Sequence, residues 1–285
     1  MMNDKIRNAA KAFLAMDSHL RNDLLKKDGK VQEKKLWENT FIKHQIDRRN
    51  QGGTFSIEDH IRAMVYSMLS SGISWQRVES GIDNDTGKII PIDKIFCQYD
   101  VKTLLQSTPE ELRDKIKELR CASLQTLAQM KALLEDNIPK LSALEKQHGS
   151  IDNFYQHFIN ADPTLNTLVL VLSEKNSKYN LSQMGEALTA EYLRNLGYDI
   201  SKPDRHIRRI LGSKYLGCSE SEIVPIYEAF DIVAEIAAEL GKPVAEVDYI
   251  LWSYCANGYG EVCTLNKPKC EKCVVKEYCK KECQL

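Results

Sequence analysis

Four cysteines gather near the C-terminal end of the sequence, at Cys263, Cys270, Cys273 and Cys279. Their spacing is C-x6-C-x2-C-x5-C, with one short pair and no histidine nearby. Structural zinc sites usually combine two short pairs of cysteines, or of cysteines with histidines. Four thiolates on one compact segment also suit a [4Fe–4S] cluster, in which each iron takes one cysteine. The spacing alone leaves three interpretations open: a [4Fe–4S] cluster, a zinc loop, or four unliganded thiols.

The rest of the sequence indicates the compartment of these thiols. Its first residues, MMNDKIRNAAKAFLAM, lack the long apolar stretch and small-residue cleavage site of a signal peptide. No apolar run approaches the ~20 residues of a membrane span, so no membrane partner is expected. We therefore expect a cytoplasmic protein, associated with the nucleoid if bacterial. Disulfides rarely persist in a reducing cytosol, which favours a metal or a cluster for the cysteine group.

Asp204 is a further candidate for a catalytic role. It ends the stretch Ser201-Lys202-Pro203-Asp204, in which an acid three residues after the cap predicts a capping box at a helix start. An isolated pattern of this kind usually does no more than cap a helix. A further role for the carboxylate has to come from the motifs around it.

Charge is distributed unevenly along the chain, although the net charge of -1 favours no particular partner. The segment 202–216 contains five basic residues and one acidic residue. The segment 267–281 contains six lysines and two glutamates. The segment 220–239 between them carries six acids and no base. A dedicated nucleic-acid binder is often strongly basic overall. Each run taken alone is typical of a solvated helix face.

The pattern of apolar residues predicts helices nearly throughout the chain. Apolar side chains recur at spacings of three and four in 59–69 and in 121–138, where Leu124 and Leu127 begin one stripe. Thr108, Pro109 and Glu111 predict a capped helix start. Breaks are expected at glycines and prolines, at 52–53, 81–91, 139, 149, 163 and 241–243. No segment alternates like a strand, so the expected fold class is all-α.

The cysteine spacing, with Lys-Pro-Lys before the second cysteine, resembles the C-terminal cluster of the endonuclease III family of helix-hairpin-helix DNA glycosylases. The resemblance continues upstream: residues 181–185 resemble the family's L-P-G-V-G hairpin, and 203–209 resemble its V-D-T-H-V-x-R motif. It covers about residues 56–279. It implies a [4Fe–4S] cluster on the four cysteines. Cys283 has no counterpart in the family pattern, and we expect it to be a free surface thiol.

The resemblance assigns roles to residues at matching positions. Asp204 would stabilise an oxocarbenium-like sugar as the base leaves, and would position or activate water. A hairpin with glycine can present backbone N–H groups to a phosphate, although Gln183 here replaces the first glycine. The expected DNA contacts from the two motifs and the basic segments are Gln183, Gly185, Arg205, His206, Arg209, Lys267 and Lys269.

Relatives that also cleave the DNA backbone carry a lysine two residues after the last hairpin glycine, where it forms a Schiff base. That position is Ala187 here, so the chain resembles the monofunctional branch. Lys178 and Lys214 are the nearest amines in the sequence.

A stretch around Trp75 resembles the family segment whose loop probes the DNA. Relatives place Gln or Asn there to fill the gap left by a flipped base, where this chain has Ser71 and Gly72. Gln76 is the alternative for filling the gap. Trp75 could stack on a base or pack in the core beside Val78.

The resemblance implies an all-α fold of two helical lobes with DNA in the cleft between them. Residues 56–189 would form a helical barrel lobe that includes the start of the helix-hairpin-helix. Residues 1–55 and 190–285 would form the second lobe, with Asp204 and the cluster loop. The implied protein is a monomeric DNA glycosylase of base-excision repair, whose partner is duplex DNA with a damaged, mispaired or abasic site. The alternatives are a bifunctional glycosylase/lyase using another amine, and a non-catalytic DNA-binding iron–sulfur protein.

Overall fold

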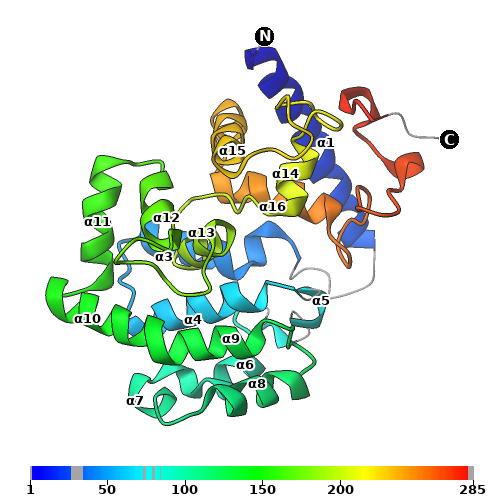
Figure 1. Cartoon of the computed structure of the whole chain (residues 1–285). Helices are drawn as coiled ribbons and strands as arrows, with labels where there is room; N and C mark the ends of the chain where they lie inside the picture. Colours follow the sequence, from blue (N-terminus) through cyan, green and yellow to red (C-terminus); the bar gives the residue numbers. More distant parts are fainter. Residues whose placement is uncertain (1, 27–34, 73–74, 79–80, 84, 282–285) are drawn as a thin grey trace. The chain divides into compact units, whose positions relative to one another are not determined.

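A computed structural model of the chain describes residues 2–26, 35–72, 75–78, 81–83 and 85–281 (Figure 1). Cys283 lies outside these ranges. Within them the chain is mostly helical, and its only extended pairing is a single bridge between Ile82 and Ile89. The expected all-α class is therefore confirmed for the described residues. None of the helices in these ranges is long and apolar enough to cross a membrane.

The chain divides into two compact units. The terminal unit comprises residues 1–43 and 199–285, and the central unit comprises residues 44–198. These borders differ from the expected ones at 55/56 and 189/190. A border at 189/190 would cut through helix α13 (Glu186–Asn195), whose ten residues pack as one piece against α4 (Ile57–Leu69). Arg49 also belongs with the central unit, because its Nε donates to the carbonyl oxygen of Leu196 at 2.8 Å.

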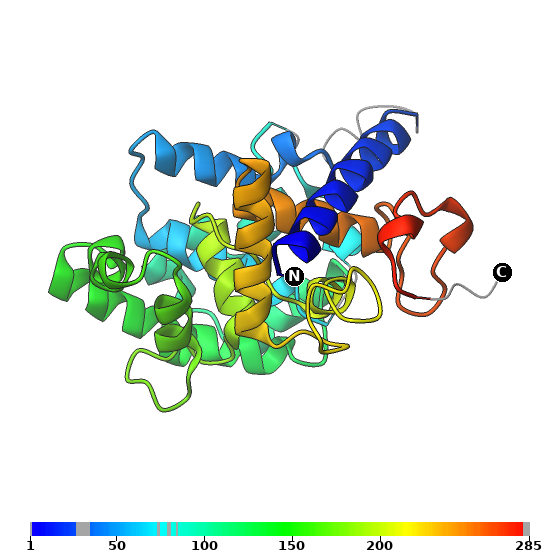
Figure 2. The same ribbon diagram turned by 90° about the horizontal axis from the view of Figure 1, so that it is seen from above.

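The terminal unit is built on α1 (Met2–Lys26), which packs along α15 (Ile226–Leu240) and α16 (Val244–Cys255), as both views show (Figures 1 and 2). Phe13 and Met16 of α1 are fully buried in this unit. Asp199 starts α16, because its carboxylate accepts from the amides of Val244 and Ala245 at 3.1 and 2.8 Å. The shorter elements of the unit are η1 (Trp37–Asn39), α14 (Arg205–Ile210), η5 (Cys270–Lys272) and η6 (Lys276–Tyr278).

The central unit surrounds α4, whose residues are almost all buried. Ser56 and Asp59 form a capping box at the start of α4, and Thr108 and Glu111 form the predicted one at the start of α8. Helix α3 (Phe41–Asn50) belongs to this unit from His44 onward. The other described elements of the unit are α5 (Trp75–Val78), α6 (Ile90–Ile95), η3 (Cys97–Tyr99), α7 (Val101–Leu104), α8 (Pro109–Glu118), α9 (Thr126–Ala132), η4 (Leu133–Asn137), α10 (Ile138–His148), α11 (Ile151–Ala161) and α12 (Asn166–Ser173).

The helical path does not stop at Pro139, contrary to the break expected there. α9, η4 and α10 follow one another without a gap from Thr126 to His148, and η4 is π-helical. The amide of Ile138 bonds to the carbonyl of Leu133, five residues back. A proline inside a helix lacks an N–H and crowds the carbonyl four residues before it. Widening the preceding turn to a π-helix accommodates the ring, and such turns are frequent at functional sites.

A buried polar network joins α4, α11 and α13 inside the central unit. His60 Nδ1 lies 2.6 Å from the Tyr192 hydroxyl, which lies 2.8 Å from the hydroxyl of Tyr155. Tyr198 donates to Asp152 Oδ1 at 2.8 Å. Burial lowers the pKa of His60 to about 4, so the imidazole is neutral at pH 7.

Candidate functional site

The four cysteines singled out by their spacing come together in the terminal unit. All four line one cavity of about 270 Å³, and none of the eight described cysteines forms a disulfide. The walls between the thiols include Val262, Pro268 and Lys276. The four thiols, at most sixteen positions apart in the sequence, thus share one space, as a common ligand would require.

The geometry of the thiols bears on which group they fit. Among the described residues, no three histidine, cysteine, aspartate or glutamate side chains lie close enough together to hold a single metal ion. A zinc site would bring its sulfurs to within about 2.3 Å of one point. The thiols surround a cavity, and an all-cysteine donor set occurs in iron–sulfur clusters as well as in structural zinc sites. The residues present therefore fit a [4Fe–4S] cluster.

Tyr254, the penultimate residue of α16, fixes the cluster loop at several points. Its hydroxyl donates to Cys273 Sγ at 3.4 Å and accepts from the Val274 amide at 3.1 Å. Its carbonyl oxygen accepts from the amides of Val262 and Cys263, both at 3.1 Å. Burial raises the pKa of Tyr254, which keeps its hydroxyl a donor. No sequence pattern singles out Tyr254, because it stands in an ordinary apolar helix pattern.

Cys263 has two further neighbours. A hydrogen bond from the Cys255 thiol and the guanidinium of Arg209 together lower the pKa of Cys263 to about 6. Arg209 Nη1 lies 3.5 Å from Cys263 Sγ, and Nη2 donates to the carbonyl oxygen of Cys263 at 2.5 Å. Arg209 is only 4% exposed. Arg209 was expected to contact DNA. In the structure it is buried and connects α14 to the cluster loop through these contacts with Cys263.

Asp204 is itself the N-cap of α14. Its Oδ1 accepts from the amides of His206 and Ile207 at 2.7 and 3.2 Å. The capping box expected from Ser201 is absent here, since the Ser201 hydroxyl is buried with no hydrogen-bond partner among the described residues. The half-buried Asp204 carboxylate uses Oδ1 for the cap, and no hydrogen bond from the described residues reaches Oδ2.

Helix α16 also positions the chain that leads into Asp204. Asp248 of α16 is 1% exposed, and its Oδ1 accepts from the Lys202 amide at 2.7 Å. His206 lies half-buried on α14, and burial lowers its pKa. One helix thus holds the Asp204 segment through Asp248 and the cluster loop through Tyr254.

The two basic segments meet in the terminal unit, where the amide of Lys280 donates to the carbonyl oxygen of Tyr215 at 2.8 Å. Several of their cations are engaged within the protein: Arg208 Nε donates to the Val224 carbonyl at 2.6 Å, Lys214 pairs with Glu222 at 2.6 Å, and Lys269 pairs with Glu261 at 3.0 Å. Of the expected DNA contacts in this unit, Arg205 and Lys267 are exposed. Further exposed lysines of the cluster loop are Lys272, Lys276 and Lys280.

The hairpin lies in the central unit, between α12 and α13. Leu181 and Met184 are buried, and the Met184 amide closes a turn on the Leu181 carbonyl at 3.1 Å. Gln183 is exposed with φ of 63°, a left-handed conformation that explains why glycine suits this position. Gly185 is exposed, and a Cβ added to it would meet no atom within 4 Å. The turn therefore presents an uncrowded surface at Gly185.

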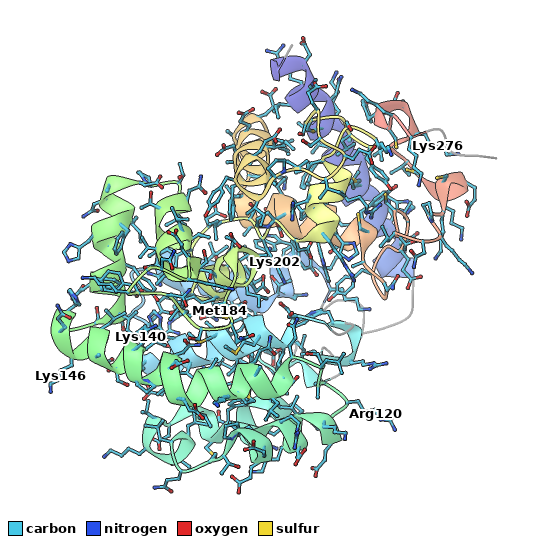
Figure 3. The ribbon with its side chains drawn as sticks, in the orientation of Figure 1. Arg120, Lys140, Lys146, Met184, Lys202 and Lys276 are labelled. Atoms are coloured by element: carbon cyan, nitrogen blue, oxygen red, sulfur yellow. The ribbon has the colours of Figure 1, made fainter. Side chains whose placement is uncertain are left out.

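Asn137 holds the hairpin in place, and sequence reasoning missed it. Its Nδ2 donates to the Ser182 carbonyl at 3.0 Å, and its Oδ1 accepts from the Ser182 amide at 2.8 Å. Asn137 is completely buried at the end of the π-helical segment η4. Lys140, which lies near Met184 beside the hairpin (Figure 3), donates to the carbonyl oxygen of Asn180. The local sequence signal was Pro139, which marks the irregular turn.

The Trp75 segment also lies in the central unit. Trp75 begins the short helix α5 and is half-buried, while the side chain of Gln76 lies outside the described residues. The Ser71 hydroxyl donates to Gln125 Oε1 at 3.1 Å. Leu124, expected in an apolar stripe, instead stands fully exposed (105%) just before α9 begins. The surface next to Gln125 thus carries an exposed aliphatic side chain that the periodicity placed in an apolar stripe.

Ala187 lies in the first turn of α13, where the lyase branch has its lysine. The two lysines nearest in sequence have neighbours of their own. Lys178 Nζ lies 4.6 Å from the centre of the Tyr179 ring, and Lys214 is paired with Glu222.

Comparisons with protein-family models, curated proteins and solved structures found no match to this chain. The residues that carry chemistry are therefore identified by their types and their geometry. Asp204 and the cluster loop belong to the terminal unit, and the hairpin and the Trp75 segment belong to the central unit.

Proposed function

We propose that the protein is a DNA N-glycosylase of base-excision repair. It would flip a damaged or mispaired nucleotide out of a duplex and hydrolyse its N-glycosidic bond. The observation that carries the proposal is the arrangement on α16, which holds both a four-cysteine cavity and the segment that ends in Asp204. The sequence resemblance supplies the reaction class, and this arrangement supports it.

Asp204 is the catalytic residue of the proposal. Two backbone amides fix its Oδ1, so the carboxylate needs no reorganisation during the reaction. Oδ2 is left to face positive charge that develops on the sugar as the base departs, or to orient the attacking water. Polysaccharide hydrolysis usually takes two carboxylates. A nucleobase is a better leaving group than a sugar, so one carboxylate is a sufficient minimum.

The cluster would be held by Cys263, Cys270, Cys273 and Cys279. When bound, it supplies a structural cross-link for the loop. The chain's own residues do the rest: Tyr254 and Arg209 fix the loop to α16 and α14, and the loop presents Lys267 and other exposed lysines to solvent. Such lysines bind phosphates without regard to sequence. The cluster loop therefore belongs to DNA binding in this proposal, with Asp204 reserved for bond cleavage.

The proposed enzyme is monofunctional. The lyase branch of the family places its attacking lysine where Ala187 stands, and both Lys178 and Lys214 have other neighbours. Water is then the nucleophile, and the products are a free base and an abasic site. Borohydride trapping on abasic DNA is expected to leave no covalent protein–DNA adduct, and an adduct would favour the bifunctional alternative.

Single-turnover base release tests the proposal directly. The purified protein would be incubated with duplexes carrying alkylated, oxidised, deaminated or mismatched bases, beside the Asp204→Asn variant. We expect release of base from at least one duplex by the native protein, with that release lost in the variant. Tight DNA binding without release from any duplex would instead indicate the non-catalytic alternative.

A further inference from the structure

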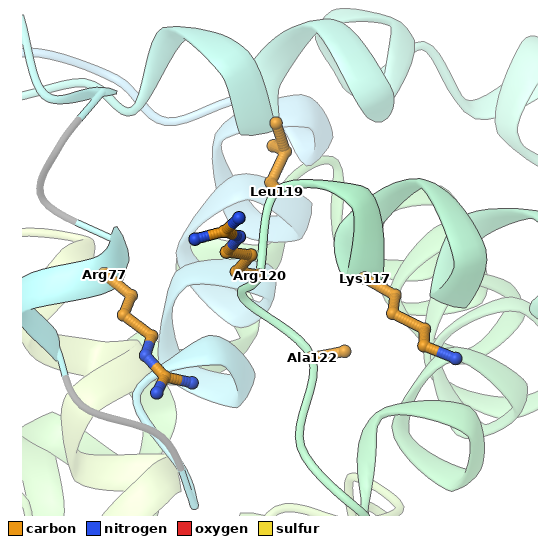
Figure 4. Close-up of a pocket in the computed structure, with 5 residues that line it drawn as sticks. All are labelled: Arg77, Lys117, Leu119, Arg120 and Ala122. Carbon is orange, nitrogen blue, oxygen red and sulfur yellow. The ribbon is translucent and has the colours of Figure 1, made fainter.

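A basic surface pocket lies in the central unit, and none of the residues used in the proposed function lines it. It has a volume of about 450 Å³ and is lined by Arg77, Lys117, Leu119, Arg120 and Ala122 (Figure 4). Three of the five lining residues are cations, and none is an acid. Arg77 and Arg120 lie on one side of the segment 119–122 and Lys117 on the other (Figure 4). All three cations are exposed to solvent.

The backbone at Arg120 is unusual for its residue type. Arg120 follows the end of α8 with φ of 59°, the left-handed region that glycine normally fills at this position. Its amide bonds to the Lys117 carbonyl at 2.9 Å, and the Cys121 amide bonds to the Ile116 carbonyl at 3.1 Å. These two bonds form a Schellman motif, which favours glycine. An arginine held in a strained conformation beside a pocket points to a role for its side chain.

Buried residues beneath the surface hold the pocket walls in place. Cys121 and Ile116 are buried, and their apolar contact commonly accompanies this type of helix end. The Cys121 thiol lies 3.8 Å from the carbonyl oxygen of Arg77, which joins the α5 side of the pocket to the 119–122 side. The two arginines are therefore brought close by the fold from positions more than forty residues apart in the sequence.

Helix electrostatics explain only part of this arrangement. A lysine in the last turn of a helix interacts favourably with the C-terminal carbonyls, which accounts for Lys117. Arg77 likewise lies in the last turn of its helix, although α5 has only four residues. Helix electrostatics do not account for an arginine in place of glycine at 120. Planar guanidinium groups recognise phosphate oxygens with two parallel hydrogen bonds. Two arginines and a lysine around one space thus suit a phosphate group.

We propose that Arg77, Lys117 and Arg120 form a phosphate-binding pocket, and that its ligand is a backbone phosphate of DNA. The choice of DNA over a free phosphate rests on the proposed function and on Leu124. That leucine is fully exposed four residues after Arg120, and aliphatic side chains of this kind insert between base steps. A phosphate site beside a free leucine suits a nucleic-acid backbone better than a small anion.

Arg120→Gly is a clean test, because glycine favours the left-handed conformation that Arg120 adopts. The variant removes the guanidinium and should leave the melting temperature unchanged or raised. Lys117→Gln is the second pocket variant. Lys146→Gln is the control, since it removes one exposed charge at the other end of the central unit from Arg120 (Figure 3). Affinity for a duplex with an abasic-site analogue would be measured by fluorescence anisotropy across a potassium chloride series.

We expect Arg120→Gly and Lys117→Gln each to weaken binding severalfold to about tenfold at low salt, and to reduce the slope of log affinity against log salt by about 0.9. Lys146→Gln should match the native protein. A parallel arm would measure the melting temperature with inorganic phosphate, pyrophosphate or a dinucleotide, to separate a free phosphate from a DNA phosphate.

The outcomes separate the pocket from the proposed function. If Arg120→Gly and Lys117→Gln bind DNA as the native protein does, and phosphates stabilise none of the three proteins, the phosphate pocket is overturned. The glycosylase proposal is unaffected by that result. A different result is that pyrophosphate stabilises a native protein that binds no duplex, and that Arg120→Gly abolishes this stabilisation. This result supports a phosphate pocket but overturns DNA as its ligand. If the native protein neither binds duplex DNA nor is stabilised by phosphates, both proposals are overturned.

Discussion

The Tyr254 hydroxyl donates to Cys273 Sγ at 3.4 Å, while the Tyr254 carbonyl accepts from the Cys263 amide at 3.1 Å. One residue of α16 therefore holds two of the four cysteines, one through its side chain and one through its backbone. Because α16 also holds the chain before Asp204 through Asp248, the loop and the carboxylate share a rigid support.

Tyr254→Phe should loosen the cluster loop without unfolding the protein. The ring stays, but Cys273 loses a donor and the Val274 amide loses its acceptor. We expect a loss of about 1 kcal/mol in the free energy of unfolding, measured by denaturant titration. Hydrogen bonds to cluster sulfurs influence reduction potential, so a cluster-loaded variant should also show a shifted potential in voltammetry. Potential and stability both equal to those of the native protein would contradict this role for the hydroxyl.

Metal analysis of anaerobically prepared protein should find about four irons per chain, with the brown colour of a [4Fe–4S] cluster. Cys273→Ser should lower the iron content and DNA affinity together, because the loop carries the exposed lysines Lys267 and Lys272. Cys218→Ser is the matched control, since that cysteine is buried and does not line the cavity of the four thiols. One zinc per chain and no iron would overturn the cluster assignment.

Local patterns in the sequence predicted local features of the fold. The capped start of α8 at Thr108 was predicted from residues three apart in sequence. The capping box at the start of α4 has the same spacing but was not predicted. Pro139 was misread as a break because a π-helical turn can absorb a proline, and the sequence does not specify which outcome occurs. Leu124 was wrongly assigned to an apolar face because α9 begins only at Thr126.

The sequence predicted the parts of the candidate site whose residues lie close together in the chain. It did not predict the residues that hold these parts in place from distant positions in the sequence. Cysteine spacing alone singled out four thiols that share one cavity. Asn137 and Ser182 are forty-five positions apart, and Tyr254 reaches Cys273 across nineteen. Contacts of this range leave no periodic signal. Arg209 matched a motif position, yet its burial against Cys263 could be seen only in the folded chain.

Gly185→Ala tests whether DNA approaches the hairpin backbone. The φ of Gly185 is -71°, and an added Cβ meets no protein atom within 4 Å, so the fold should tolerate alanine within about 0.5 kcal/mol. A phosphate seated on the turn would meet the new methyl group, and we expect duplex affinity to fall severalfold in anisotropy measurements.

Gln183→Gly is the matched variant for the hairpin. It relieves the left-handed conformation at 183 and should stabilise the protein by up to about 1 kcal/mol while keeping or raising DNA affinity. If both variants bind duplex as the native protein does, the hairpin does not contact the DNA backbone.

Acid should destabilise the protein through His60. Its pKa is about 4 in the folded protein against 6.5 for the free side chain, so the unfolded chain binds the proton more tightly. Stability is therefore full above about pH 6.5 and falls as the pH drops toward 4. Between pH 7 and 5 the native protein should lose about 2 kcal/mol through this group, measured by urea unfolding.

His60→Asn provides the comparison for that pH dependence. The amide can still reach Tyr192, but it has no proton to bind in this range. The variant should start less stable because it packs less well, and its stability should change less between pH 7 and 5. Parallel losses in the two proteins would assign the acid sensitivity to other groups.

The roles of Asp204 as cap and as catalyst can be separated by two substitutions. Asp204→Asn keeps a side-chain oxygen for the amides of His206 and Ile207, so α14 should remain capped. It replaces the charge of the second oxygen with a neutral amide. We therefore expect a folded variant that binds DNA near normally and releases base at least ~100-fold more slowly in single-turnover assays.

Asp204→Ala removes the cap as well as the charge. Its free energy of unfolding should fall by roughly 1 kcal/mol below that of Asp204→Asn, with base release equally slow. A residue that only caps would give the reverse pattern, in which Asn is nearly silent and Ala acts through stability alone. Melting temperatures and single-turnover rates of both variants, measured side by side, distinguish the two. Native rates of base release in Asp204→Asn would leave Asp204 as the cap of α14 and nothing more.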